Sequence, residues 1–257
     1  MTPIEIIRAE SRPLEPEPTG VRPEVGPLDG IRHLVFDVYG TLFLSGVGDI
    51  GISRPGSRGH LLARTLDRFG LSFESPAERL GKAFLSAIRD HQEQRRGQGV
   101  AHPEVDIREV WKDFLIRCGI DAPSGTFTVE SLATAFECAV NPVWPVPGLA
   151  DFLRETAAKP LAIVSNAQFF TPLLFDALLN RGLDDLGFDR SACVWSYEAR
   201  EAKPSTRLYE EVVNRLGVKP AEALFVGNDM LNDIMPAARV GLRTARFAGD
   251  RRSLRLR

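Results

Sequence analysis

The sequence Phe-Asp-Val-Tyr-Gly-Thr-Leu-Phe at residues 36–43 decides the fold. It begins at the end of an apolar run, Leu34–Phe36, and continues into a carboxylate and a Gly-Thr turn. We expect the run to be a buried strand that places Asp37 at the carboxyl edge of a sheet, where open α/β folds bind ligands. A carboxylate there can act as a nucleophile and form a covalent intermediate. A single aspartate after a strand also fits a helix cap, so the assignment depends on the rest of the chain.

Apolar runs of strand length recur along the chain and alternate with helix-like segments from residue 147 onward. The predicted strands are Leu34–Phe36, Leu161–Val164, Ala192–Trp195 and Ala223–Val226. The predicted helices of this part are Leu149–Ala158, Pro172–Asn180, Ser205–Leu216 and Asp233–Val240. Such alternation is typical of βαβ units, so we predict an α/β fold with a three-layer, Rossmann-like core and a parallel sheet.

The stretch 46–145 interrupts this rhythm, because it shows helical periodicity and no convincing strand. Gly and Pro residues separate its predicted helices, which are His60–Phe69, Pro76–Arg96, Asp106–Cys118 and Val129–Asn141. An all-helical insertion directly after the first strand would lie over the carboxyl edge of the sheet as a lid. Its first part is rich in arginine, which either clamps an anionic substrate or forms a solvated helix face. These residues are Arg54, Arg58, Arg64 and Arg68.

The two ends of the chain differ in composition from the rest. Residues 1–30 hold six of the 18 prolines, which predicts an N-terminal arm or a disordered leader. Residues 251–257 are basic, and we expect a solvated tail. The predicted organisation is an arm (1–30), a Rossmann-like core (31–45 and 146–250), a helical cap (46–145) and a basic tail (251–257).

Composition is that of an ordinary globular protein, with 44% hydrophobic and 26% charged residues. The formal net charge of −2 gives no reason to expect a nucleic-acid partner. The three cysteines, Cys118, Cys138 and Cys193, are far apart, which favours neither disulfides nor a zinc site. No apolar run approaches the roughly 20 residues of a membrane span, and no signal peptide is evident. We therefore expect a cytoplasmic protein.

Three further pieces carry residues suited to chemistry. Ser165 and Asn166 end the second predicted strand and can donate hydrogen bonds to an anion or cap a helix. Lys203 precedes a proline-started helix and can neutralise a carboxylate, although it is also compatible with an ordinary surface lysine. Asp229 and Asp233 follow the last predicted strand and can either face one Mg²⁺ ion or favour a helix N-terminus through its dipole.

The order, placement and spacing of these four pieces resemble those of the haloacid dehalogenase (HAD) superfamily. The resemblance covers about residues 31–248 and rests on DVYGTLF, SN, AKPSTRLY and GNDMLND. The helical insertion is similar to the C1-type cap of that superfamily. The resemblance implies a hydrolase in which Asp37 attacks the substrate and becomes covalently modified, in a site that includes Tyr39 and Thr41.

The same resemblance implies roles for the other pieces. Ser165 and Lys203 would hold negative charge, and Asn166 would support the site. Asp37, Asp229 and Asp233 would hold Mg²⁺ if the reaction is phosphoryl transfer. Asn228 stands where a Gly-Asp pattern is common in the family, so either Asn228 or Asp229 takes the ligand position, and we favour the charged Asp229.

Tyr39 departs from the phosphatase pattern of this family, in which a second aspartate follows the nucleophile by two residues. A tyrosine with a pKa of about 10 is a poor base at neutral pH. Tyrosine at this position resembles the 2-haloacid dehalogenases, which need neither metal nor acid to release halide. The first motif therefore indicates a dehalogenase, whereas the acidic fourth motif indicates magnesium and phosphate.

We predict first a Mg²⁺-dependent phosphatase of small phosphorylated metabolites, because of Asp229, Asp233 and Lys203. The alternatives are a metal-independent 2-haloacid dehalogenase and a low-turnover protein that binds or senses a phosphate ligand. In each case the expected partner is a small anionic molecule rather than nucleic acid or a membrane. The sequence does not indicate an oligomeric state.

Overall fold

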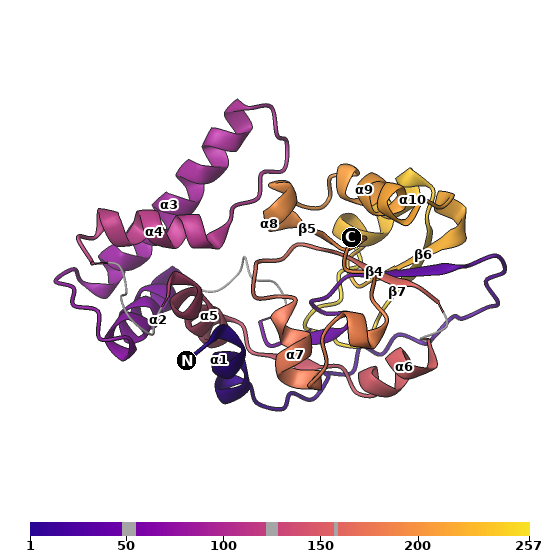
Figure 1. Ribbon diagram of the computed structural model, residues 1–257, viewed down its shortest axis with the longest axis horizontal. Coiled ribbons are helices and arrows are strands. Elements are labelled where there is room, and N and C mark those ends of the chain that lie inside the picture. Colours follow the sequence, from indigo (N-terminus) through magenta and orange to yellow (C-terminus); the bar gives the residue numbers. More distant parts are fainter. Residues whose placement is uncertain (48–54, 122–127, 157–158) are drawn as a thin grey trace.

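The computed structural model describes residues 1–47, 55–121, 128–156 and 159–257. Its centre is a five-stranded parallel sheet with the strand order β5-β4-β1-β6-β7. The strands are β1 (His33–Phe36), β4 (Leu161–Ser165), β5 (Val194–Trp195), β6 (Ala223–Gly227) and β7 (Arg243–Arg246). The predicted α/β class and Rossmann-like core are confirmed (Figure 1).

Helices cover both faces of this sheet. One face carries α6 (Leu149–Glu155) and α7 (Leu173–Leu179), and the other carries α9 (Arg207–Leu216) and α10 (Met235–Val240) (Figure 1). Three shorter helices, α8 (Ser196–Ala199), η2 (Asp184–Leu186) and η3 (Pro220–Glu222), lie in the connections. A parallel sheet covered on both faces requires apolar side chains on both, which is why its central strands read as continuous hydrophobic runs.

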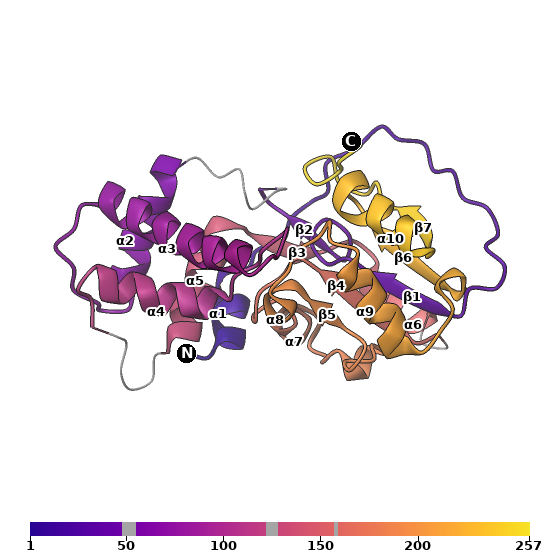
Figure 2. The ribbon, with the colours of Figure 1, turned by 90° about the horizontal axis from the view of Figure 1, so that it is seen from above.

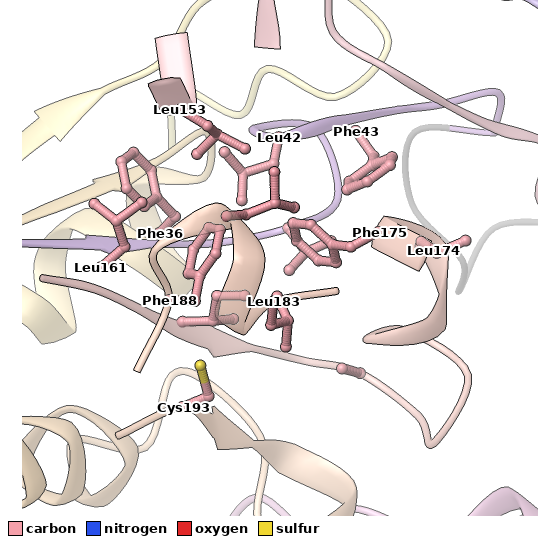
Figure 3. Close-up of a cluster of buried hydrophobic side chains, with 14 of the residues drawn as sticks. Phe36, Leu42, Phe43, Leu153, Leu161, Leu174, Phe175, Leu183, Phe188 and Cys193 are labelled. Atoms are coloured by element: carbon pink, nitrogen blue, oxygen red, sulfur yellow. The ribbon is translucent and has the colours of Figure 1, made fainter. Parts of the chain in front are cut away.

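The first strand shows how this burial positions the site. Leu34 and Phe36 pack among the side chains of α6 and α7, whereas Val35 faces the α9 side. Figure 3 shows Phe36 beside Phe188, with the two rings 6.5 Å apart in an edge-on arrangement. A shift of β1 by one residue would exchange its two faces, so this packing fixes the register that places Asp37 at the carboxyl edge.

A helical cap is inserted after β1 and lies beside the core (Figure 2). Its helices are α2 (Pro55–Arg68), α3 (Ala77–Gly97), α4 (Ile107–Arg117) and α5 (Val129–Val140). They correspond to the four helices predicted for this stretch, and they enclose an aromatic cluster of Phe84, Trp111, Phe114 and Phe136. The longest, α3, has 21 residues, and no helix among the described residues is long and apolar enough to cross a membrane.

Two short strands connect the cap to the core. The strand β2 (Phe43–Ser45) leaves the core and pairs antiparallel with β3 (Val143–Pro145), which returns to it. The prediction that residues 46–145 contain no strand is therefore wrong, because β3 lies at the C-terminal end of this stretch. Three residues, one of them a proline, are too few to show a strand periodicity, and the pairing partner lies about 100 residues earlier in the chain.

Other differences from the predicted elements have local causes. The sheet has an edge strand, β7, that was not predicted, because Arg-Thr-Ala-Arg contains no apolar run. The predicted end of the helix Leu149–Ala158 reaches positions 157 and 158, which lie outside the described residues, as do positions 48–54 and 122–127 of the predicted cap. The predicted helix Asp233–Val240 is present as α10, preceded by a π-helical turn, η4 (Met230–Ile234).

The N-terminal arm is a structured part of the molecule. Its helix α1 (Pro3–Glu10) begins with a capping box between Thr2 and Glu5, and it buries Ile6 and Ile7 against α5 and α7. Beyond α1, the chain runs around the outside of the core to β1 (Figure 2). On the way, residues 15–19 form hydrogen bonds with residues 248–252. The alternative of a disordered leader is thus wrong for these parts of residues 1–30.

Candidate active site

The four motifs meet at the carboxyl edge of the sheet. Asp37 follows β1, Ser165 is the last residue of β4, and Asp233 lies in the π-helical turn after β6. Because β4, β1 and β6 are neighbours in the sheet, these side chains emerge next to one another. Lys203, from the segment before α9, reaches the same point. The fold therefore assembles residues that are widely separated in sequence.

The carboxylate of Asp37 is held through one of its two oxygens. Oδ1 accepts hydrogen bonds from Ser165 Oγ at 2.8 Å and from Lys203 Nζ at 2.7 Å. No hydrogen bond to Oδ2 arises from the described residues. The carboxylate thus has one oxygen fixed by two donors and a second one available to a substrate.

Lys203 forms a buried bridge between two carboxylates. Its ammonium donates to Asp233 Oδ1 at 2.6 Å as well as to Asp37, and all three side chains are buried. Burial opposes its charge, but Asp233 and Asp37 outweigh that effect and raise the pKa of Lys203. Burial, opposed by Lys203, raises the pKa of Asp233 to about 6, so both groups remain charged at neutral pH. The bridge is a fixed positive charge beside the nucleophile.

Asn166 and Ser165 support this arrangement from β4. Asn166 Oδ1 accepts a hydrogen bond of 2.8 Å from the backbone N–H of Lys203. This contact fixes the main chain from which the lysine side chain extends, so Asn166 acts on Asp37 through Lys203. Neither residue caps a helix, which was the alternative interpretation of the Ser-Asn pair.

Tyr39 occupies the position of the absent second aspartate, and its surroundings do not suit an acid–base role. Its hydroxyl forms a 3.0 Å hydrogen bond with Thr171 Oγ1. Burial and the nearby Glu137 carboxylate, offset in part by that hydrogen bond, raise the pKa of Tyr39 above its ordinary value. The phenol therefore stays protonated at neutral pH and cannot serve as a base.

The two aspartates of the fourth motif accept hydrogen bonds from backbone N–H groups of the same motif. Asp229 Oδ1 caps the turn η4 by accepting from the N–H groups of Leu231 and Asn232, and its Oδ2 accepts from Asn232 Nδ2. Asp233 Oδ2 accepts from the N–H groups of Asn228 and Asp229. The helix N-terminus alternative therefore describes Asp229, whereas Asp233 holds the backbone before the turn and contacts Lys203.

The other member of that motif, Asn228, connects to the first. Its Oδ1 accepts a 3.0 Å hydrogen bond from Thr41 Oγ1, and its Nδ2 donates to the carbonyl of Ser253 at 2.7 Å. Thr41 thus links the first motif to the fourth.

Asp37, Asp229 and Asp233, the carboxylates expected to hold Mg²⁺, are not grouped as a metal site in the described structure. Magnesium takes oxygen ligands in near-octahedral geometry, usually one or two carboxylates together with water or substrate oxygens. Every carboxylate oxygen of Asp229 and Asp233 already accepts a hydrogen bond within the protein. Within residues 1–47, 55–121, 128–156 and 159–257, no three His, Cys, Asp or Glu side chains are grouped so that they could hold a metal ion.

A cavity of about 360 Å³ opens above Asp37. The core lines it with the motif residues and with residues 166–168 and Phe170, and the cap lines it with Glu104, Ile107 and Glu137. The C-terminal segment lines it with Ser253 and Arg255. The predicted position of the cap over the sheet edge therefore agrees with the walls of this cavity.

Of the arginines considered as an anion clamp, the described ones, Arg58, Arg64 and Arg68, do not line this cavity. Arg64 is exposed, and Arg68 forms an ion pair of 2.8 Å with Glu10 on α1. Arg58 has an electrostatic interaction with Glu137. Arg54 lies outside the described residues. The solvated-face alternative describes Arg64, whereas Arg68 links the cap to the N-terminal helix.

Several residues of the site were not found from the sequence. Glu137, Ser253 and Arg255 line the cavity, but they lie far from any motif and only the tertiary fold brings them there. Tyr209 lies within AKPSTRLY, and its hydroxyl donates to the carbonyl of Asn232 at 2.6 Å. Its position six residues after Lys203, on the buried face of α9, was the only available signal.

Comparison with known proteins agrees with this geometry. A family model described as haloacid dehalogenase-like hydrolase matches residues 31–241. The (S)-2-haloacid dehalogenase of Xanthobacter autotrophicus is 30% identical over 221 residues, which cover 85% of this chain and 75% of that enzyme. The glyceraldehyde 3-phosphate phosphatase of Methanothermobacter thermautotrophicus is 31% identical over 100 residues, 38% of this chain and 42% of that enzyme.

Solved structures give the same fold. An HAD family enzyme of Bacteroides thetaiotaomicron aligns with a TM-score of 0.56 at 16% identity, over 86% of this chain and 95% of that one. At this identity the likeness concerns the fold alone. The family match spans most of the chain, including all four motifs that converge on Asp37. This chain belongs to the haloacid dehalogenase-like hydrolase family.

Proposed function

We propose that this hydrolase displaces a leaving group from carbon through an ester on Asp37, without a metal ion, as a 2-haloacid dehalogenase-type enzyme. The observation that carries the proposal is the Lys203 ammonium, which lies within 2.7 Å of both Asp37 Oδ1 and Asp233 Oδ1. A protein cation thus lies between the two carboxylates and supplies positive charge beside the nucleophile without a metal ion.

In the first step, Asp37 Oδ2 attacks the carbon that bears the leaving group. A C–O bond forms, the bond to the leaving group breaks, and the leaving group departs with the electron pair. A halide needs no proton to leave, so the chemistry is compatible with a protonated Tyr39 in place of a carboxylic acid. The free Oδ2 makes this oxygen, rather than Oδ1, the attacking atom.

In the second step, water attacks the ester carbon of Asp37. Negative charge then develops on Oδ1, which already accepts from Ser165 Oγ and Lys203 Nζ. Preorganised donors on an oxygen that becomes charged are the arrangement that lowers such barriers. Collapse of the tetrahedral intermediate breaks the bond between the Asp37 carbonyl carbon and the oxygen of the product. One proton of the water passes to that oxygen, which gives the hydroxylated product, and the other is released to solvent as the carboxylate is restored.

Relatives support the same chemistry. The haloacid dehalogenase of Xanthobacter autotrophicus matches this chain over most of both lengths, and we propose a small halogenated acid as substrate. The three cysteines are unpaired, which fits the cytoplasmic setting proposed from the sequence.

A second candidate is a Mg²⁺-dependent phosphatase of small phosphorylated metabolites. It is favoured by the glyceraldehyde 3-phosphate phosphatase relatives, although the chain spans about half or less of the length of those enzymes. It would require Asp229 to leave its capping position and offer its carboxylate to the ion.

Halide and phosphate release separate these candidates. We expect halide release from 2-chloropropionate that is unchanged by EDTA, and no phosphate release from a panel that includes glyceraldehyde 3-phosphate. Phosphate release that requires Mg²⁺ would establish the second candidate instead. Binding of inorganic phosphate without turnover of either class would indicate a binding or regulatory protein. The Asp37→Asn variant, which we expect to be inactive, controls for contaminating activity.

A further inference from the structure

We infer that the C-terminal segment 250–257 is part of the substrate site and that Ser253 and Arg255 bind the anionic group of the substrate. The inference deepens the proposed function and rests on it, because the substrate is the molecule that Asp37 attacks. The anionic group is a carboxylate or a phosphate, which share the chemistry of oxygens that accept hydrogen bonds from a guanidinium and a hydroxyl.

The segment is anchored and is not the solvated tail expected from its composition. Asp250 is buried, and its carboxylate accepts hydrogen bonds from Glu17 N and from Arg252 N and Nε. The backbone of Arg251 donates to the carbonyl of Glu17. The N-terminal arm therefore holds the C-terminal segment in place, which explains why a basic, polar sequence adopts one conformation here.

These anchors bring the segment against the catalytic motifs. Arg255 forms an isolated parallel bridge with Asp229, in which Arg255 N donates to Asn228 O and Met230 N donates to Arg255 O. Two residues earlier, the carbonyl of Ser253 accepts from Asn228 Nδ2. The segment thus extends the fourth motif along the wall of the cavity, with Ser253 and Arg255 both lining it.

The side chains that line the cavity are mostly acidic, so an anionic substrate needs a cation there. The described lining includes five acidic side chains and two basic ones. The acids are Asp37, Glu104, Glu137, Asp229 and Asp233, and the bases are Lys203 and Arg255. Lys203 is already shared between two carboxylates. An anion entering this cavity would be repelled by the acids unless a second cation compensated for them.

Arg255 is the cation in a position to do so. Its Nη1 donates to the carbonyls of Arg252 and Leu254, which fixes the guanidinium, and it forms no ion pair with any described carboxylate. Nε and Nη2 have no acceptor within the described residues. A guanidinium with its orientation fixed and two nitrogens available is suited to bind a carboxylate or phosphate.

Ser253 provides the second, independent observation. The residue is 1% exposed and lines the cavity, and its buried Oγ has no hydrogen-bond partner in the described structure. A buried hydroxyl without a partner is costly, because it has lost its hydrogen bonds to water. An oxygen of an anion bound at this wall of the cavity would satisfy it.

The test measures substrate selection separately from chemistry. In Arg255→Gln, we expect the KM for 2-chloropropionate to rise about 10- to 100-fold with kcat nearly unchanged, because a charge-assisted hydrogen bond is lost from binding. The KM for the uncharged 2-chloropropionamide should not change. Ser253→Ala should show the same pattern with a smaller rise. Arg257→Gln, an exposed arginine of the same segment, is the matched control.

A binding measurement separates this inference from the proposed reaction. In an Asp37→Asn background, the affinity for 2-chloropropionate and for inorganic phosphate is measured by calorimetric titration. We expect Arg255→Gln to weaken the binding of whichever anion the protein binds. The difference between the two titrations identifies the anion as carboxylate or phosphate. Loss of turnover toward both substrate classes with this difference intact would overturn the proposed function alone. Equal affinities, equal KM values, or no binding of either anion to the Asp37→Asn protein would overturn the inference.

Discussion

Lys203 Nζ lies 2.7 Å from Asp37 Oδ1, and no described residue donates a hydrogen bond to Oδ2 of the same carboxylate. This asymmetry gives the two oxygens different tasks. The free oxygen attacks, and the held oxygen carries the charge that develops when the ester is hydrolysed. Because Lys203 also holds Asp233, one lysine connects the nucleophile to the fourth motif.

Replacement of Lys203 tests this arrangement. Lys203→Met should lower the rate of ester hydrolysis by about 10²- to 10³-fold, as expected for loss of a donor to a developing oxyanion. It should also lower the free energy of unfolding by about 3–5 kcal/mol, because buried carboxylates lose their counter-charge. Single-turnover kinetics and urea unfolding measure the two effects, with the exposed Lys112→Met as control. Unaltered hydrolysis in a folded Lys203→Met protein would contradict the assigned role.

Replacement of Tyr39 tests whether its hydroxyl takes part in the chemistry. Tyr39→Phe removes the hydrogen bond to Thr171 but keeps the ring, so we expect halide release to stay within about threefold of the wild-type rate. Thr171→Val, which removes the other partner of the same bond, should behave alike. A fall of 100-fold or more in Tyr39→Phe alone would show that the phenol acts directly on the substrate or the intermediate.

The parts of the fold that the sequence predicted are those encoded by local patterns. A buried strand followed by Asp37, and the strand ends at Ser165 and Asp233, are visible as apolar runs that stop at polar residues. Parallel strands present such ends at one edge, so the convergence of the motifs followed from the fold class. The cap helices were visible from their periodicity in the same way.

The parts that could not be predicted depend on contacts between distant segments. Nothing local in Arg-Ser-Leu-Arg distinguishes a solvated tail from a wall of the active site, since the anchor of that segment is Asp250 bound to the backbone of Glu17, 233 residues earlier. Glu137 likewise lines the cavity only because the end of α5 lies where the chain returns through β3 to the core. Spacing also suggested a shared metal for Asp229 and Asp233, whereas their oxygens are taken by backbone amides and Lys203.

Stability should depend on pH through Glu137. Burial, opposed by the charge of Arg58, raises its pKa from 4.5 to about 7 in the folded protein. The folded state therefore holds this proton more tightly than the unfolded state. The associated stabilisation is complete below pH 4.5 and is lost as the pH rises through about 7.

Glu137→Gln removes this dependence, because glutamine resembles the protonated acid at every pH. Relative to wild type, the variant should gain stability between pH 5 and pH 8, measured as the free energy of unfolding in urea. The exposed Glu93→Gln is the matched control. A difference between Glu137→Gln and wild type that is the same at both pH values would contradict the raised pKa.

Gly40 should tolerate no side chain, for two separable reasons. Its φ is +82°, which strains any L-residue, and a Cβ there would lie 2.5 Å from Ser253 Cβ and 2.7 Å from Asn228 Nδ2. The close neighbours of this glycine are thus Ser253 of the C-terminal segment and Asn228 of the fourth motif. Gly40→Ala should lower the free energy of unfolding by about 1–3 kcal/mol through overpacking, beyond the cost of the strained φ alone.

Gly30→Ala measures the cost of the strained φ by itself, because Gly30 has a φ of +79° and nothing within 4 Å of the added carbon. Equal destabilisation of the two variants in urea unfolding would mean that the C-terminal segment does not press against the first motif.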